Sequence, residues 1–223
     1  MKKDNISRRT FLKTGIAVGA GLYGLSYLSS FERPRPLKTF KENRLKKGMV
    51  VVHGDVDERN DESSVIKEMV NRGIKAIGGM DKLVSRGDNV VIKPNIAWDR
   101  KPEYAVNTNP FVVAALVGMC LEAGANRVKV FDHTCASNPD TSYTNSGIEK
   151  AAKEAGAVVR FVDKGLFKNI KIPDGKVLDS WTFYEELIYQ DETDVLINVP
   201  IAKQHSASRL SMALKNTLGM VGG

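Results

Sequence analysis

Three apolar runs in this sequence each end in polar side chains of the kinds that bind anions or transfer protons. The polar residues at these three ends are Lys93 and Asn95, then Asp132 and His133, and then Asn198, Lys203 and His205. In an open parallel sheet, ligands bind beyond the carboxyl ends of the strands, where the loops leave room. We therefore expect the three groups of side chains to meet at one rim and to form a site there.

Binding of a small anion is the first chemistry that fits this set. The lysine ammonium is a point charge for a carboxylate or phosphate, and side-chain amides add hydrogen-bond donors. The residues expected to hold the ligand are Lys93, Asn95, Asp132, Asn198, Lys215 and Asn216. His205, Lys203 and His133 are the candidates for catalysis, the histidines as general acid or base.

A metal site is the second chemistry that the same residues allow. Asp132, His133 and His205 would suit a divalent ion such as zinc, iron or nickel. Their spacing lacks a compact signature such as HExxH, so the cofactor stays unknown, with a divalent metal as an alternative. Cys120 and Cys135 are the only cysteines and cannot supply the four thiolates of an iron–sulfur cluster. Cys120 falls in an apolar helical run, which favours a small buried residue.

The elements expected to position these residues alternate along the chain. Strand patterns cover residues 49–55, 89–95, 127–132, 158–163 and 194–200. Helical patterns fall between them, at about 61–79, 110–124 and 147–157, and a helix-like segment covers about 208–222, whereas 133–146 is expected to be a polar loop. Residues 164–189 look like an insertion rich in strands. This alternation predicts an α/β fold with a mostly parallel sheet and helices on both faces.

The charge of the chain argues against a nucleic-acid partner. Its 33 basic and 26 acidic residues give a net charge of +7. Five of those bases and one of the acids lie within the first 31 residues, so the remainder has 28 bases and 25 acids, a net charge of +3. A surplus of that size is too small to predict a polyanion-binding surface.

The N-terminus predicts export. Paired arginines, Arg8 and Arg9, stand before Thr-Phe-Leu-Lys and an uncharged stretch of moderate hydrophobicity, which is the layout of a twin-arginine signal. We divide the chain into a signal or N-terminal anchor at 1–31, a linker at 32–47 and a domain at 48–223. The twin-arginine machinery is the expected partner, with the periplasm or cell exterior as destination. The apolar stretch is followed by no good cleavage site, so an uncleaved segment would be the chain's one membrane contact.

Three segments together resemble the bacterial and archaeal domain-of-unknown-function family numbered 362. They read VVIKPNIAW, TNPFVVAALVGMCLEAGANRVKVFDHT and DVLINVPIAKQHSASRLSMALKNTLGMVGG. The residues at the family's motif positions are Lys93, Pro94, Asn95, Asp132, Asn198, Pro200, Lys203, His205, Lys215, Asn216 and Gly219. Many relatives carry ferredoxin-type cysteine modules, which this chain lacks. Family members continue past the Lys-Asn-Gly helix, so the resemblance implies a domain that is incomplete at its C-terminus.

Two functional classes are therefore expected. The first is an exported α/β enzyme that acts on a small anionic substrate at the strand rim. The second is a non-catalytic metal-binding or redox accessory protein that uses the same rim. The sequence identifies neither the substrate nor the oligomeric state.

Overall fold

The computed structural model describes residues 49–55, 61–162, 164–188 and 192–222. The expected export signal at 1–31 and linker at 32–47 lie outside these residues. Within the described part of the chain, no helix has both the length and the apolar character needed to cross a bilayer.

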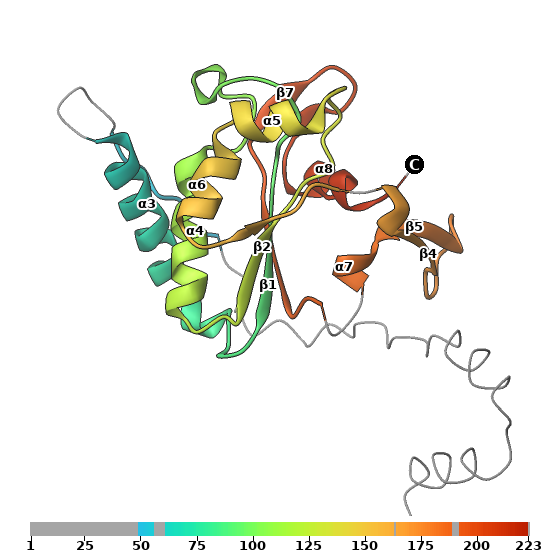
Figure 1. Cartoon of the computed structure of the whole chain (residues 1–223), viewed down its shortest axis with the longest axis horizontal. Helices are drawn as coiled ribbons and strands as arrows, with labels where there is room; N and C mark the ends of the chain where they lie inside the picture. Colours follow the sequence, from blue (N-terminus) through green and yellow to red (C-terminus); the bar gives the residue numbers. More distant parts are fainter. Residues whose placement is uncertain (1–48, 56–60, 163, 189–191, 223) are drawn as a thin grey trace, which may run out of the picture. The chain divides into compact units, whose positions relative to one another are not determined.

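A four-stranded parallel sheet forms the middle of the domain (Figure 1). Its strands, in spatial order, are β3 (Val158–Val159), β2 (Arg127–Val130), β1 (Asn89–Pro94) and β6 (Val195–Val199). The register pairs Ile92 of β1 with Val130 on one side and Ile197 on the other. β1 is buried from its second residue onward. A parallel strand covered on both faces needs nearly continuous apolar residues, which is why Val90, Val91 and Ile92 follow one another here.

Helices cover one face of this sheet. The two that pack closest to it are α4 (Pro110–Glu122) and α6 (Ile148–Glu154), and α3 (Glu62–Ala76) packs on α4. The sequence sets two of these helix starts, because Asp61 accepts a hydrogen bond from the Ser64 backbone and Asn109 accepts one from Phe111 before the first-turn Pro110. The main hydrophobic core lies here, between α4, α6 and the sheet.

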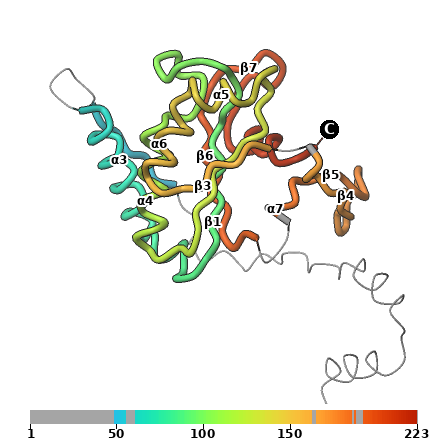
Figure 2. The backbone as a smooth tube through the Cα atoms, in the orientation of Figure 1, coloured from blue at the N-terminus to red at the C-terminus, as the bar shows by residue number. Residues whose placement is uncertain are grey.

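The opposite face carries a smaller core made of Val91, Phe131, Tyr184 and Met220. An antiparallel hairpin of β4 (Phe167–Lys171) and β5 (Ser180–Tyr184) brings in Tyr184, followed by α7 (Glu185–Ile188). Two short helical turns, α8 (Ala213–Asn216) and η4 (Thr217–Met220), bring in Met220. Figure 2 shows that these C-terminal turns return to the sheet on the side away from α3 and α4.

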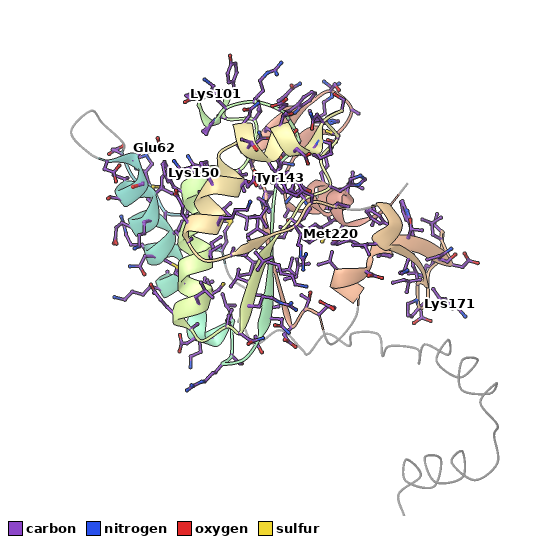
Figure 3. All side chains as sticks on the ribbon, viewed as in Figure 1. Glu62, Lys101, Tyr143, Lys150, Lys171 and Met220 are labelled. Carbon is purple, nitrogen blue, oxygen red and sulfur yellow. The ribbon has the colours of Figure 1, made fainter. Side chains whose placement is uncertain are left out.

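The remaining elements are short. They are η1 (Met80–Lys82), η2 (Pro102–Tyr104), α5 (Pro139–Asn145), η3 (Lys164–Leu166) and the antiparallel hairpin of β7 (Lys203–His205) and β8 (Arg209–Ser211). In Figure 3, Tyr143 and Met220 lie among the buried side chains, whereas Lys101, Lys150 and Lys171 stand on the outside.

The predicted α/β class is confirmed, but several element predictions were wrong. Residues 49–55 form no strand; the segment lies against α3, with Gly54 beside Met69 and Val52 beside Gly73. The expected loop at 133–146 contains α5, which starts where the Asn138 side chain caps the helix ahead of Pro139.

Strand lengths and the last segment also differ from the prediction. The strand expected at 127–132 ends at Val130, and the one expected at 158–163 has two residues. The helix-like pattern at 208–222 is β8 followed by α8 and η4. Arg209 has a φ of 63°, which a helix does not allow, so the chain turns into a hairpin there.

Candidate functional site

A buried ion pair lies where β1 and β2 end. Lys93 Nζ is 2.6 Å from Asp132 Oδ1, and the two side chains are only 1% and 4% exposed. Alternation along β1 turns Lys93 to the same face as Val91, and Asp132 follows the end of the neighbouring strand. The second carboxylate oxygen of Asp132 accepts a hydrogen bond from the Ile96 backbone at 2.6 Å.

The ammonium of Lys93 has a partner for each of its three protons. Besides Asp132, it donates to the Pro94 carbonyl at 2.9 Å and to Asn216 Oδ1 at 3.1 Å. Burial lowers the pKa of Lys93, while the charge of Asp132 and its hydrogen bond act in the opposite direction. The pair is thus held in place by surrounding polar groups and is not open to solvent.

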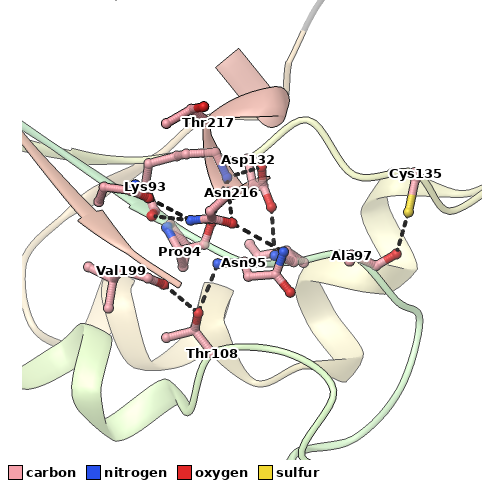
Figure 4. A network of polar contacts seen from close by, with 12 residues as sticks. Lys93, Pro94, Asn95, Ala97, Thr108, Asp132, Cys135, Val199, Asn216 and Thr217 are labelled. Carbon is pink, nitrogen blue, oxygen red and sulfur yellow. Dashed lines mark hydrogen bonds and ion pairs between the residues drawn. The ribbon is translucent and has the colours of Figure 1, made fainter. Parts of the chain in front are cut away.

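Asn216 connects the ends of β1 and β6 (Figure 4). Its Oδ1 atom accepts from Lys93 and from Asn95 Nδ2 at 3.1 Å each. Its Nδ2 atom donates to Asn198 Oδ1 at 2.7 Å and to the carbonyl oxygens of Lys93 and Pro94 at 3.2 and 3.3 Å. Because both ends of this buried amide are occupied, Asn216 positions its neighbours and has little capacity left for a ligand.

Lys203 adds a second cation to the network. Its Nζ atom donates to Asn95 Oδ1 at 2.8 Å and to the Val106 carbonyl at 2.6 Å. Burial is the main cause that lowers the pKa of Lys203, and the positive charge of Lys215 lowers it further, whereas Cys135 and Asp132 raise it. The side-chain amide of Asn95 thus accepts from Lys203 through its oxygen and donates to Asn216 through its nitrogen.

Two further hydroxyl groups fix the backbone around the ion pair. Thr108 Oγ1 accepts from the Asn95 backbone at 2.8 Å and donates to the Val199 carbonyl at 2.7 Å, which joins the ends of β1 and β6. The Tyr143 hydroxyl accepts from the Asp132 backbone N–H at 2.6 Å, and carbonyl oxygens of Asp132 and Arg160 lie 2.6 and 3.1 Å away. Burial raises the pKa of Tyr143 strongly.

A cleft of about 380 Å³ opens beside the ion pair. Its polar lining comes from Lys93, Asn95, Asp132, His133, Thr134, Cys135, Lys215 and Asn216, and its apolar lining includes Ala97, Trp181, Leu218 and Val221. Gly219 also lines the cleft and lies so close to the ion pair that a Cβ there would collide with Asp132 and Lys93. Among the described lining residues, Asp132 is the one acid.

Six of the nine predicted site residues line this cleft together: Lys93, Asn95, Asp132, His133, Lys215 and Asn216. Lys203 and Asn198 do not line it but bond to two that do. His205 lies apart, because its Nδ1 atom accepts the Ala207 and Ser208 backbone N–H groups at 3.2 and 3.3 Å and so caps the turn between β7 and β8.

Lys215 and His133 are two polar side chains of the cleft that form no hydrogen bond with a described residue. Lys215 makes no hydrogen bond or ion pair with any residue in the described part of the chain. The ring of His133 packs on Phe167, with ring centres 5.4 Å apart, and makes no hydrogen bond to a described residue. Together with the Thr134 hydroxyl, which accepts from the Ala136 backbone N–H and donates to no described residue, these are the side chains with donors left for a ligand.

The three residues proposed as metal ligands are not brought together. Across the residues that the structure describes, no group of three or more His, Cys, Asp and Glu side chains has the arrangement needed to hold a metal ion. The carboxylate of Asp132 is bonded to Lys93 and to the Ile96 backbone N–H. His205 accepts backbone hydrogen bonds in the turn between β7 and β8.

Sequence reasoning missed several lining residues, among them Thr134, Cys135, Trp181 and Leu218. Cys135 stands three residues after Asp132, so its place just past a strand end was a usable signal. Its Sγ atom donates to the Ala97 carbonyl at 3.1 Å, and it is free of any disulfide, as is Cys120. Cys120 is buried as expected, which raises the pKa of its thiol to about 12. Trp181 comes from the inserted hairpin, and nothing in the spacing of the sequence points to it.

Comparison with known proteins agrees with the export signal and the domain. Residues 5–22 match the twin-arginine translocation pathway signal sequence, so the protein is exported across the cytoplasmic membrane. A thylakoid-associated protein of Synechocystis sp. is 25% identical over 156 residues, which cover 67% of this chain and 44% of that protein. The chain thus spans less than half the length of this relative. No solved structure matches the chain. Residues 90–223, more than half of the chain, match the domain of unknown function DUF362, and the chain belongs to that family.

Proposed function

We propose that the cleft binds a small anionic molecule, a carboxylate or a phosphate, and that the protein is an exported enzyme that acts on it. Three lysines lie in or next to the cleft, namely Lys93, Lys203 and Lys215, against the single carboxylate of Asp132. That carboxylate is already paired with Lys93. The local surplus of two positive charges favours an anionic ligand.

The observation that carries the proposal is the uncompensated charge of Lys203 and Lys215. After burial, repulsion by the positive charge of Lys215 is one of the causes that lower the pKa of Lys203. No acceptor among the described residues pairs with Lys215. An anion in the cleft would relieve that repulsion and use the free donors of Lys215.

The location within the sheet supports the same function. Strand order reverses at β1, because β2 lies on one side of it and β6 on the other. Ligands of open α/β sheets bind at such a point, beyond the carboxyl ends of the strands. Here Asn216 fills the gap between β1 and β6, and the cleft opens beside it over the ends of β1 and β2.

His133 is the residue we assign to proton transfer. Of the described histidines it is the one that lines the cleft, and its ring nitrogens have no protein partner among the described residues. General acid or base catalysis needs a side chain within hydrogen-bond reach of the reacting group, which a cleft residue satisfies. Lys203 acts indirectly, because its ammonium donates to Asn95, which lines the cleft, and adds positive charge next to the ligand. His205 has no direct role.

Anion titration tests the binding step. Phosphate and acetate are titrated separately into the protein and into the Lys215→Ala variant by isothermal titration calorimetry. Loss of a charge-assisted contact of about 1.5–3 kcal/mol predicts binding weakened at least tenfold in the variant. Lys67→Ala, which removes an exposed lysine of α3 far from the cleft in sequence and fold, should bind both anions as the wild type does. If the wild type binds neither anion, or if both variants behave alike, the proposal is wrong.

A further inference from the structure

The cleft has an apolar side that a bare inorganic anion would leave unused. Trp181 is 39% exposed and Leu218 is 55% exposed, although both line a concave site. Val221 lies on the same lining. Large apolar side chains that stay exposed in a cleft with a few polar groups are typical of small-molecule sites.

The ring of Trp181 is held in place by the protein. Its Nε1 atom donates to the Gly222 carbonyl at 2.7 Å, and Thr182 Oγ1 donates to the same oxygen at 2.9 Å. The Gly222 backbone N–H donates to the Thr182 carbonyl at 2.9 Å, next to a β-bridge between Phe183 and Val221. The indole is thus fixed with its one polar atom occupied, so what it offers a ligand is an apolar surface.

The size of the cleft also favours an organic ligand over a bare inorganic anion. Clefts that hold organic ligands begin at about 300 Å³, and this one measures about 380 Å³. Acetate or phosphate would fill a small part of it. A ligand that contacts both Lys215 and Trp181 needs a negatively charged end and an apolar body.

We propose that the ligand is an aromatic carboxylate, with its carboxylate at Lys215 and its ring against Trp181 and Leu218. This rests on the proposed anion-binding function and specifies its substrate class. A sugar phosphate fits less well, because its hydroxyl groups would face Leu218 and Val221, which offer them no hydrogen bond. A planar ring leaves no polar group unpaired there.

A series of carboxylates of increasing apolar size tests the assignment. Benzoate, cyclohexanecarboxylate and acetate are titrated by calorimetry into the protein. Burial of a phenyl ring predicts that benzoate binds about tenfold or more tightly than acetate, and more tightly than cyclohexanecarboxylate. Trp181→Ala should remove most of the preference for benzoate over acetate and leave acetate binding unchanged, whereas Trp181→Phe should keep more of that preference.

The second tryptophan provides a control and an optical signal. Trp98 is 54% exposed and lies outside the cleft lining, so Trp98→Phe should bind all three carboxylates like the wild type. The chain has two tryptophans, so the tryptophan fluorescence of this variant, excited at a wavelength that tyrosine does not absorb, comes from Trp181 alone. Benzoate should change that emission at the concentrations at which calorimetry shows binding, and acetate should not.

The outcomes separate the two proposals. If acetate binds and benzoate binds no more tightly, the aromatic assignment is overturned and anion binding stands. Equal affinity for benzoate and cyclohexanecarboxylate would likewise overturn it, as would unchanged benzoate binding in a Trp181→Ala variant that thermal unfolding shows to be folded. If phosphate binds but neither acetate nor benzoate does, the aromatic carboxylate assignment is overturned and anion binding stands. If phosphate, acetate and benzoate all fail to bind, the anion-binding function itself is wrong.

Discussion

At the scale of single residues, the Lys93–Asp132 pair is the feature on which the site depends. Removing two charges from water costs several kcal/mol for each ion, and their attraction offsets this only when the remaining donors and acceptors are also satisfied. Here the ammonium has three acceptors, and the carboxylate also holds the Ile96 backbone N–H. The surrounding amides are what make such a pair tolerable in the interior.

Removing one partner of this pair should destabilise the fold strongly. Lys93→Met leaves the Asp132 carboxylate buried without a counter-charge, for an expected loss of about 3–5 kcal/mol in the free energy of unfolding. Lys93→Met combined with Asp132→Asn removes both charges and keeps an oxygen for the Ile96 N–H, so it should recover most of that loss. Urea denaturation of the wild type, the single variant and the double variant measures both values. A double variant as unstable as the single one would contradict this account.

Tyr143 should stabilise Asp132 through its hydroxyl group. Tyr143→Phe leaves the Asp132 backbone N–H without a buried acceptor, for an expected cost of about 1–3 kcal/mol at neutral pH.

The same substitution has a pH signature. The pKa of Tyr143 is raised in the folded protein above the ordinary value of 10.0, so above about pH 10 the unfolded chain loses this proton first. The contribution of the hydroxyl is therefore fully present below pH 10 and is lost as the pH rises beyond it. The difference in urea midpoint between wild type and Tyr143→Phe should shrink between pH 9 and pH 11. A constant difference would show that the hydroxyl is not held in its neutral form.

At the scale of elements, the site forms because η4 lies directly over the ends of β1 and β2. Gly219 of η4 faces the ion pair, and Met220, the next residue, enters the smaller core beside Val91. A residue with a side chain at 219 would push η4 away from the strands. The sequence therefore needs glycine here for space, since its φ is not in the left-handed region.

Gly219→Ala should consequently damage the site. The added methyl group meets Asp132 and Lys93, two side chains held by several partners, and overpacking of that kind costs about 1–3 kcal/mol. Gly118→Ala in α4 is the matched control, because a Cβ there meets nothing within 4 Å and alanine favours the helix by about 0.5–1 kcal/mol. Thermal unfolding and acetate titration should show reduced stability and weaker binding for the first variant alone. Equal behaviour of the two would mean that η4 can shift freely.

The elements also show what the sequence could and could not predict. Apolar runs bounded by polar residues located β1 and β6, and the cap at Asn109 with Pro110 located α4, because these signals are local. The predicted helix at 208–222 included β8, whereas β7 fell in a predicted loop. The turn between them depends on the backbone of Arg209 and on the side chain of His205, and hydrophobic periodicity carries no information about either. The same turn explains why His205 was taken for a cleft residue.

At the scale of the whole molecule, the site is formed by segments that lie far apart in the sequence, and this limits which of its residues the sequence predicts. Lys93 and Asp132 lie at the ends of two neighbouring strands, and a parallel sheet with loops at one rim was enough to predict that they meet. Asn216, which accepts from Lys93, lies in the short α8, and the strand-end pattern did not include it. That Asp132 neutralises Lys93, and that Trp181 completes the cleft, depends on side-chain packing and on an inserted hairpin. No pattern in the sequence carries that information.

Export links the stability of this domain to its location. The match at residues 5–22 directs the chain to the twin-arginine pathway, which carries folded proteins, and a periplasmic location follows from that signal. A native protein is stable by only about 5–15 kcal/mol, so a loss of 3–5 kcal/mol raises the unfolded fraction by orders of magnitude. Variants that unfold the domain should therefore be exported poorly even though their signal is intact.

Variants of the Lys93–Asp132 ion pair separate the effect of domain stability on export from the function of the cleft. Lys93→Met should accumulate inside the cell or be degraded, whereas the double variant with Asp132→Asn, being more stable, should be exported close to the level of the wild type. Replacement of Arg8 and Arg9 by lysine keeps the charge but removes the paired arginines, so it should block export of a fully folded domain. Immunoblots of periplasmic and cytoplasmic fractions measure all three. Since export requires a folded domain and not a working cleft, the level of export should follow the urea midpoints; normal export of Lys93→Met would break that link.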